Sequence, residues 1–204
     1  MTSTPWSRQA FWLVRHAPVN SSVLYGQQDV PADLKDPAPF RWLAAALPLQ
    51  ARWISSDLSR CRETAHRILS ERDAPPSVTE VASLREQSFG EWEGLTYDQA
   101  RDRDRDFYDR FWESPATNRP PGGESFTDMQ ARVLCARDAL PEVGDHVMVV
   151  HAGTVRAMVA DALSLSPDRA LALGIEPLSL TRLVRYRDGQ STQWQVDWIN
   201  RIPG

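Results

Sequence analysis

Four short segments of the chain carry residues whose side chains could together transfer a phosphoryl group. They contain Arg15 with His16, Arg60, Glu86 and His151. An imidazole can attack phosphorus through one ring nitrogen while an acceptor holds the other. Guanidinium groups match the oxygens of a phosphate, and a carboxylic acid can protonate the oxygen that leaves. These residue types favour phosphoryl transfer through a covalent histidine.

Each of these residues has one role in this interpretation. His16 is the nucleophile, and Arg15 and Arg60 bind the phosphoryl oxygens. His151 adds charge or a donor to the same oxygens as they become more negative. Glu86 protonates the leaving oxygen and later takes a proton from water. Because these groups supply the positive charge themselves, and the spacings of a dinuclear metal site are missing, the sequence predicts neither a metal nor a cofactor.

Other signatures of phosphate and hydrolase chemistry are missing from the sequence. It contains no GxxxxGK[ST] loop and no GxSxG elbow. Cys61 and Arg67 have the C-x₅-R spacing of a cysteine phosphatase, but the residues between them predict a helix without glycine. A phosphate-binding loop needs open backbone N–H groups instead. Cys61 and Cys135 also lack the spacing of a disulfide framework or a zinc site.

The elements around the candidate residues should bring them to one edge of a sheet. The apolar runs 11–14 and 147–150 predict buried strands, each with a histidine at its carboxyl end. A strand over 52–56 is followed by a helix to Ser70, so Arg60 lies near a helix N-terminus that favours an anion. This helix has three candidate N-caps, Ser56, Asp57 and Ser59. Ligand sites of open α/β sheets gather at the carboxyl ends of the strands.

The remaining segments alternate between helix and strand. Helices are predicted over 40–47, 96–112, 124–140 and 154–163, and strands over 78–81, 179–186 and 192–199. Asp188 and Gly189 predict a hairpin between the last two strands. We therefore predict an α/β fold, a three-layer sandwich with a mostly parallel central sheet, helices on both faces and an antiparallel edge hairpin.

Length and charge set limits on the organisation and the partners. A chain of 204 residues allows one domain, 1–204, and the proline-rich connector 114–123 suggests a helical subdomain or lid at about 95–123. The net charge of −4 argues against nucleic acid and membrane surfaces as partners. No apolar run approaches ~18 residues, and residues 1–10 do not have the pattern of a signal peptide. We expect a cytoplasmic monomer or homodimer that acts on a small-molecule phosphate ester.

Five segments, in order, resemble the motifs of the histidine phosphatase superfamily, the phosphoglycerate-mutase-like phosphatases. They are residues 13–17, 55–65, 84–94, 121–125 and 149–153. Ala17 and Ala152 stand where the family often has glycine. The family often places a phosphate-contacting asparagine seven residues after the first arginine, where this chain has Ser22. Asn20 lies two residues earlier, so the resemblance implies phosphate binding by either Asn20 or Ser22.

The resemblance implies a metal-independent phosphomonoesterase that works through a phosphohistidine. Mutases of the family carry a longer segment between the acid loop (residues 84–94) and the proline-glycine connector (residues 121–125), where this chain has only residues 95–120. That difference favours a phosphatase, and the length resembles the branch that includes α-ribazole phosphatase. α-Ribazole 5'-phosphate, sugar phosphates and nucleoside monophosphates are candidate substrates. A 2,3-bisphosphoglycerate-dependent phosphoglycerate mutase and a non-catalytic module that binds a phospho-ligand are the alternatives.

Overall fold

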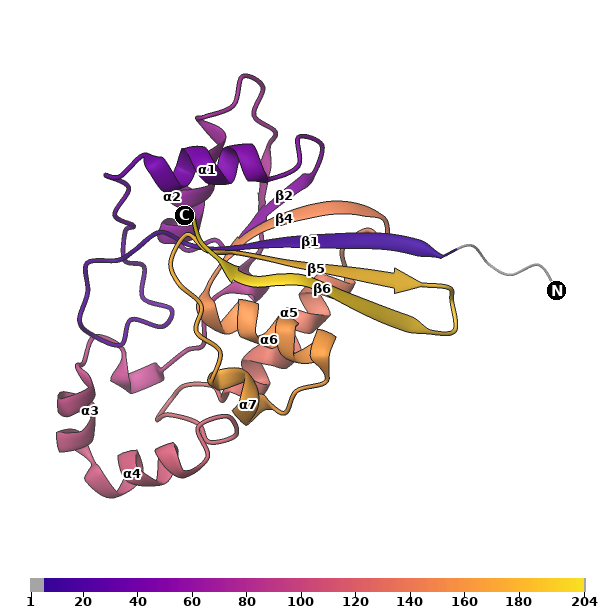
Figure 1. Cartoon of the computed structure of the whole chain (residues 1–204). Coiled ribbons are helices and arrows are strands. Elements are labelled where there is room, and N and C mark those ends of the chain that lie inside the picture. Colours follow the sequence, from indigo (N-terminus) through magenta and orange to yellow (C-terminus); the bar gives the residue numbers. More distant parts are fainter. Residues whose placement is uncertain (1–5, 204) are drawn as a thin grey trace.

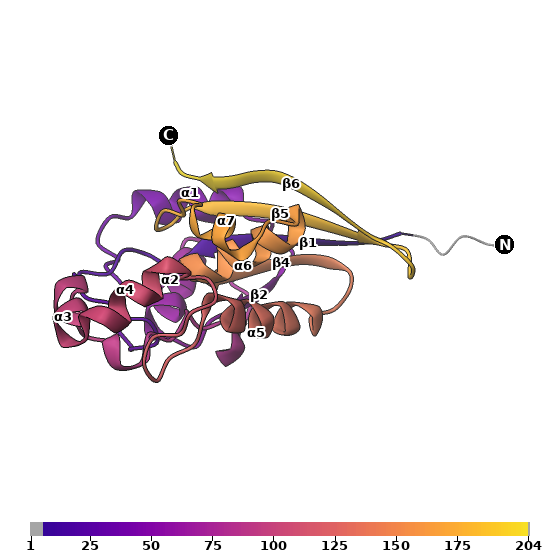
Figure 2. The ribbon, with the colours of Figure 1, turned by 90° about the horizontal axis from the view of Figure 1, so that it is seen from below.

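A mixed six-stranded sheet forms the centre of the protein, and helices cover both of its faces (Figures 1 and 2). The computed structural model describes residues 6–203. The strands follow the order β3 (Val78–Glu80), β2 (Arg52–Ser55), β4 (Gly144–Val150), β1 (Ser7–Arg15), β5 (Leu180–Arg187) and β6 (Thr192–Arg201). The first four strands are parallel to one another. Strand β5 pairs with β1 in the antiparallel direction, and β6 pairs with β5 in the antiparallel direction. The predicted sheet with an antiparallel edge hairpin is confirmed.

The helices form the two outer layers and a separate pair beyond the sheet. In residues 6–203 they are α1 (Ala38–Ala46), α2 (Ser59–Leu69), α3 (Tyr97–Arg103), α4 (Arg105–Glu113), α5 (Phe126–Asp138), α6 (Ala152–Leu163) and α7 (Pro167–Leu171). In Figure 1, α1 and α2 lie on one face of the sheet and α5, α6 and α7 on the other. Helices α3 and α4 lie beyond the carboxyl ends of the parallel strands.

The core has two main parts because side chains of a strand alternate between the two faces of a sheet. The cluster on the side of α5 and α6 includes Phe11, Leu13, Met148, Val150 and Met158. The cluster on the side of α1 and α2 includes Val14, Leu43, Ile68, Val147 and Val149. Strands β1 and β4 contribute to both clusters. The prediction that their apolar runs are buried on both faces is therefore confirmed.

The structure corrects two predicted helix boundaries. The helix predicted over 96–112 is two helices, because Asp104 adopts an extended conformation with φ −157° and its side chain accepts from Phe107 N at 2.9 Å. None of the three candidate N-caps of α2 has that position, which Leu58 takes without a side-chain cap. Asp57 pairs with Arg85 instead.

Loop contacts and a turn connect the remaining elements. Asp29, from the long loop after β1, accepts from Ser59 N at 2.6 Å and satisfies a free N–H group at the start of α2. Gly189 in the hairpin turn has φ +90°, a conformation that favours glycine. The short helix α7 has no counterpart in the sequence prediction.

Two further predictions concern membranes and domains. None of the helices in residues 6–203 has the length and apolar character needed to cross a bilayer. The prediction about a leader falls partly on residues 1–5, which lie outside the described residues. The segment predicted as a helical subdomain or lid, 95–123, contains α3 and α4. Its assignment as a lid within a single domain stays a prediction.

Candidate active site

Strands β1, β2 and β4 end side by side, and the residues that follow them form the candidate site. His16 N donates to Val150 O at 2.9 Å, and Ser56 N donates to Val149 O at 3.1 Å. These bonds extend the sheet by one residue at its carboxyl edge. They bring the rings of His16 and His151 to a centroid distance of 5.2 Å at an interplanar angle of 65°. The structure thus places the two predicted histidines together.

His16 is held as a neutral imidazole with a defined tautomer. Its Nδ1 lies 2.7 Å from Ala17 O, and a carbonyl oxygen can only accept, so Nδ1 carries the proton. The lone pair is then on Nε2. Burial lowers the pKa of His16 to about 3, and the charges of Arg60 and Arg15 also lower it. At neutral pH this imidazole is in the form that can attack phosphorus.

The two predicted phosphate-binding arginines donate to backbone carbonyl groups. Arg60, with a side chain that is fully buried, donates to Gln28 O at 2.8 Å and to Gly26 O at 2.6 Å. Arg15 donates to Ile175 O at 2.5 Å. Neither forms an ion pair with a carboxylate in the described part of the chain. Since a guanidinium has five N–H groups, both keep donors for an anion.

The Nε atoms of these two arginines are among the donors that remain for an anion. Both Nε atoms are buried and have no hydrogen-bond partner within residues 6–203. An unpartnered buried donor is costly, and an anion would satisfy it. The aromatic ring of Tyr25 lies 4.9 Å from Arg60 Cζ, which helps to hold the guanidinium in place.

His151 precedes the first residue of α6 and is fully buried. Its Nε2 lies 2.9 Å from Ser56 Oγ and 3.4 Å from Cys61 Sγ. Burial lowers the pKa of His151 well below its usual value, and the positive charge of Arg60 also lowers it. Burial also raises the pKa of the Cys61 thiol far above its usual value, so Cys61 is not an activated nucleophile. This agrees with the prediction that its C-x₅-R spacing is coincidental.

The carboxylate of Glu86 lies at the N-terminus of α6 and contacts Gly153, which is two residues after His151 in the chain. Its Oε2 accepts from Gly153 N at 3.2 Å, and its Oε1 accepts from Gln87 N at 2.9 Å. A Cβ at position 153 would overlap Glu86 Oε1, so glycine at this position makes room for the carboxylate. The structure therefore brings the predicted acid to the first turn of the helix that follows His151.

The other two predicted residues lie elsewhere in this structure. Asn20 is exposed, and its amide donates to Asp33 Oδ2 at 3.2 Å. Ser22 is also exposed. Their predicted contacts with phosphate stay predictions. Ala17, which replaces the usual glycine, is fully buried, and its methyl group packs in the cluster beneath α2.

Two hydroxyl groups support the site and are missing from the sequence prediction. Ser56 contacts His151, as given above, and Thr64 Oγ1 accepts from Ala17 N at 2.9 Å and donates to Arg60 O at 2.6 Å. Thr64 links the loop after His16 to the helix that carries Arg60. Its position four residues after Arg60, on the same helix face, was the signal available in the sequence.

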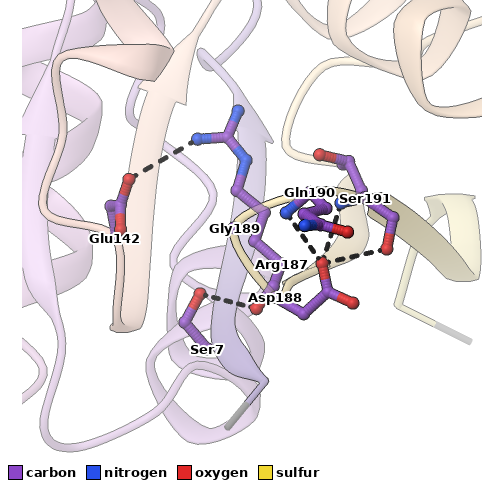
Figure 3. Close-up of a pocket in the computed structure, with 8 residues that line it drawn as sticks. Ser7, Glu142, Arg187, Asp188, Gly189, Gln190 and Ser191 are labelled. Carbon is purple, nitrogen blue, oxygen red and sulfur yellow. Dashed lines mark hydrogen bonds and ion pairs between the residues drawn. The ribbon is translucent and has the colours of Figure 1, made fainter. Parts of the chain in front are cut away.

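A hollow at the opposite end of the sheet has a different character (Figure 3). It lies between the start of β1 and the hairpin turn. Arg187 faces Glu142 at 3.8 Å, and Asp188 accepts from Ser191 N at 2.8 Å within the turn. The first interaction is an ion pair, the second is a hydrogen bond within the turn, and no histidine lines the hollow. Residues 6–203 also hold no group of three or more His, Cys, Asp or Glu side chains that could bind a metal ion.

Comparison by sequence finds relatives of this chain among curated proteins, including a phosphatase and a mutase. The bifunctional protein Rv2228c of Mycobacterium tuberculosis is 34% identical over 142 residues, 68% of this chain but only 38% of that protein. The 2,3-bisphosphoglycerate-dependent phosphoglycerate mutase 2 of Gloeobacter violaceus is 31% identical, over 68% of this chain and 66% of the mutase. The adenosylcobalamin/alpha-ribazole phosphatase of Salmonella typhimurium is 28% identical, over 76% of this chain and 79% of that enzyme.

A solved structure and a family model complete the comparison. Mycobacterial glucosyl-3-phosphoglycerate phosphatase matches with a TM-score of 0.78 and 29% identity, covering 95% of this chain and 99% of that one. The family model "Histidine phosphatase superfamily (branch 1)" matches residues 11–198, a range that contains every residue of the candidate site. From residues, geometry and relatives together, we conclude that this chain belongs to the histidine phosphatase superfamily.

Proposed function

We propose that this protein is a phosphatase that hydrolyses a small phosphate monoester through a phosphohistidine at His16. One observation carries the proposal. A neutral imidazole with its lone pair on Nε2 lies beside two arginines whose charge no carboxylate cancels in the described chain. That arrangement provides a nucleophile and a binding site for the dianion that it attacks.

In the first step, Nε2 of His16 attacks phosphorus and the bond to the ester oxygen breaks. Arg15 and Arg60 hold the phosphoryl oxygens, and His151 stabilises the negative charge that grows on them. Glu86, in its protonated form, gives its proton to the departing oxygen, so an alcohol leaves and Glu86 becomes a carboxylate. The product of this step is phospho-His16.

In the second step, water attacks the phosphorus of phospho-His16. The carboxylate of Glu86 takes a proton from this water, and the bond between phosphorus and Nε2 breaks. Inorganic phosphate leaves, and His16 and Glu86 return to their starting states. The cycle thus needs one acid–base residue and one nucleophile, and we propose that it proceeds without a metal ion.

The relatives support a phosphatase and leave a mutase as the second candidate. Phosphatases for α-ribazole phosphate and glucosyl-3-phosphoglycerate, and a phosphoglycerate mutase, are all similar to this chain. The short segment 95–120, with only α3 and α4, supports the phosphatase. The finer predictions are α-ribazole 5'-phosphate or a sugar phosphate as substrate, a cytoplasmic location, and a monomer or homodimer. A non-catalytic binding module is a lesser alternative.

A panel of phosphomonoesters, assayed for release of inorganic phosphate, tests the proposal. It includes 4-nitrophenyl phosphate, α-ribazole 5'-phosphate and sugar phosphates, each with EDTA, and 3-phosphoglycerate with and without 2,3-bisphosphoglycerate. We expect phosphate release that EDTA does not lower and that His16→Asn abolishes. Isomerisation of 3-phosphoglycerate that depends on the bisphosphate, without comparable phosphate release, would instead identify a mutase. Binding of phosphate esters without turnover would identify the binding module.

A further inference from the structure

Arg132, on α5, is an arginine beside the site whose guanidinium donates only to groups of the protein itself. It donates to three backbone carbonyls at the start of the acid loop and just before it, those of Ser83 at 3.1 Å, Arg85 at 2.7 Å and Glu86 at 2.8 Å. It also donates to both carboxylate oxygens of Glu124, at 3.0 and 2.6 Å. These bonds use all five N–H groups of the guanidinium.

Glu124 connects the same loop to the start of α5. Its Oε1 accepts from Ser88 N at 2.9 Å as well as from Arg132, and its backbone carbonyl accepts from Gln87 Nε2 at 2.8 Å. Gln27 adds a donor from the loop after β1, at 3.0 Å from Glu86 O. The main chain on both sides of Glu86 is therefore fixed by charged and amide side chains.

We propose that Arg132, together with Glu124, is a positioning residue that holds Glu86 where it can protonate the leaving oxygen. The inference rests on the proposed function and goes beyond it. Glu124 neutralises Arg132, and none of the N–H groups of Arg132 remains for a phosphate, so its effect on the reaction passes through Glu86. Transfer of a proton in the transition state needs an acid held within hydrogen-bond reach of the leaving oxygen.

The chemistry of lysine makes Arg132→Lys a sharp test. Lysine keeps the charge beside Glu124 but has three rotatable donors on one atom, and it cannot reproduce a planar set of five bonds. The loop should then hold Glu86 less firmly. An ester whose leaving group needs a proton should react slowly, whereas 4-nitrophenyl phosphate, with a weakly basic leaving group, should be nearly unaffected.

The experiment compares 4-nitrophenyl phosphate with phenyl phosphate as substrates of wild type, Arg132→Lys and Glu124→Gln. We expect kcat on phenyl phosphate to fall about 30-fold in both variants and kcat on 4-nitrophenyl phosphate to fall less than about 3-fold, within the range of general acid catalysis. In a Glu86→Gln background, Arg132→Lys should cause no further loss on phenyl phosphate, because the group it positions is gone. KM for both esters should stay close to that of wild type.

Arg119→Lys is the matched control, because Arg119 also pairs with a residue of α5, Asp128 at 2.7 Å, and its side chain is 65% exposed. It should leave both rates unchanged. Equal losses on the two esters, or the same loss in the Glu86→Gln background, would overturn the positioning role and leave a structural one. If Arg132→Lys does not fold, the kcat losses of Glu124→Gln on the two esters decide between the positioning role and the structural one. A wild type that hydrolyses neither ester would instead reject the proposed function.

Discussion

The two ends of the central sheet both hold arginines, but Arg15 and Arg60 at one end have no carboxylate partner in the described chain, unlike Arg185 at the other. At the hairpin end, Arg185 pairs with Asp138 and donates twice to Gln9 Oε1, at 3.0 and 2.5 Å. At the carboxyl end of the parallel strands, Arg15 and Arg60 donate to backbone carbonyls and form no ion pair in the described chain. Figure 1 shows the turn between β5 and β6 and the carboxyl ends of the parallel strands on opposite sides of the molecule, and Figure 3 shows the turn in close-up.

We propose that this difference separates arginines that stabilise the fold from arginines that bind a ligand. A carboxylate partner cancels the field of a guanidinium, whereas a carbonyl partner fixes its orientation and leaves the charge in place. In a protein with a net charge of −4, uncancelled buried charge marks the place where an anion is stabilised. Three pairs of substitutions and one pH dependence test this comparison.

The largest contrast is expected between two buried histidines. His16 lies at the candidate site, and His146 lies at the start of β4, 3.1 Å from Pro141 O. We expect His16→Asn to lower kcat by roughly 10⁴-fold or more, since it removes the nucleophile. His146→Asn should keep its kcat and lose about 1 kcal/mol of unfolding free energy with its hydrogen bond. Steady-state kinetics and urea unfolding measure both, and a similar kcat loss in the two variants would contradict the contrast.

The second contrast is between the arginines of the two ends. Arg60→Met should lower kcat/KM by about 10²- to 10³-fold, because buried donors to the phosphoryl oxygens are lost. Arg185→Met should leave kcat/KM near wild type and lower the unfolding free energy by about 1–3 kcal/mol, since Gln9 loses its donor and Asp138 loses one of its three arginine partners. The same assays apply. The reverse pattern, with Arg60 governing stability alone, would remove the basis of the comparison.

A smaller contrast is expected between two glycines. A Cβ at Gly153 would overlap the carboxylate of Glu86, whereas a Cβ at Gly174 meets nothing within 4 Å. Gly153→Ala should displace the acid and lower kcat on phenyl phosphate about 10-fold, a fraction of the general-acid effect. Stability should change little, because alanine favours the helix and the flexible end of Glu86 can move. Gly174→Ala, the control, should leave kcat unchanged; equal effects would show that room for Glu86 does not matter.

The last test is the dependence of stability on pH, for which a single substitution changes only the slope. Burial lowers the pKa values of His16, to about 3, and of His151. The unfolded state therefore binds protons first, so stability is complete above pH 6.5 and falls as the pH decreases toward 3, by up to about 1.4 kcal/mol per pH unit for each proton. His16→Asn should reduce the slope of unfolding free energy against pH between 6 and 4. An unchanged slope would show that His16 is protonated equally in both states.

The sequence was sufficient for the sheet and for the residues that follow its strands. Apolar runs ending in Arg15 with His16, and in His151, predict two parallel strands with functional groups at one edge, because such groups gather there. The hairpin at Gly189 follows from turn chemistry alone. These features depend on local patterns, which is why they could be predicted.

Features that depend on long-range contacts could not be predicted. Asp57 looks like an N-cap of α2, but Arg85 takes its carboxylate, and Asp29 supplies the acceptor from a distant loop. Asp104 interrupts a run with helical charge spacing because its own side chain caps the next helix. The three bonds of Arg132 to the carbonyl groups of Ser83, Arg85 and Glu86 join segments far apart in the chain, and no local pattern shows them.

The central claim, that His16 forms a covalent bond to phosphorus, is tested most directly by trapping the intermediate. Wild type and His16→Asn are mixed with ³²P-labelled ester and quenched in base, in which phosphohistidine is stable, and peptides are then analysed for label. We predict label on His16 of the wild type, stable to base and released by acid, and none in His16→Asn. Turnover by wild type without label on His16, or equal label in the variant, would contradict the account.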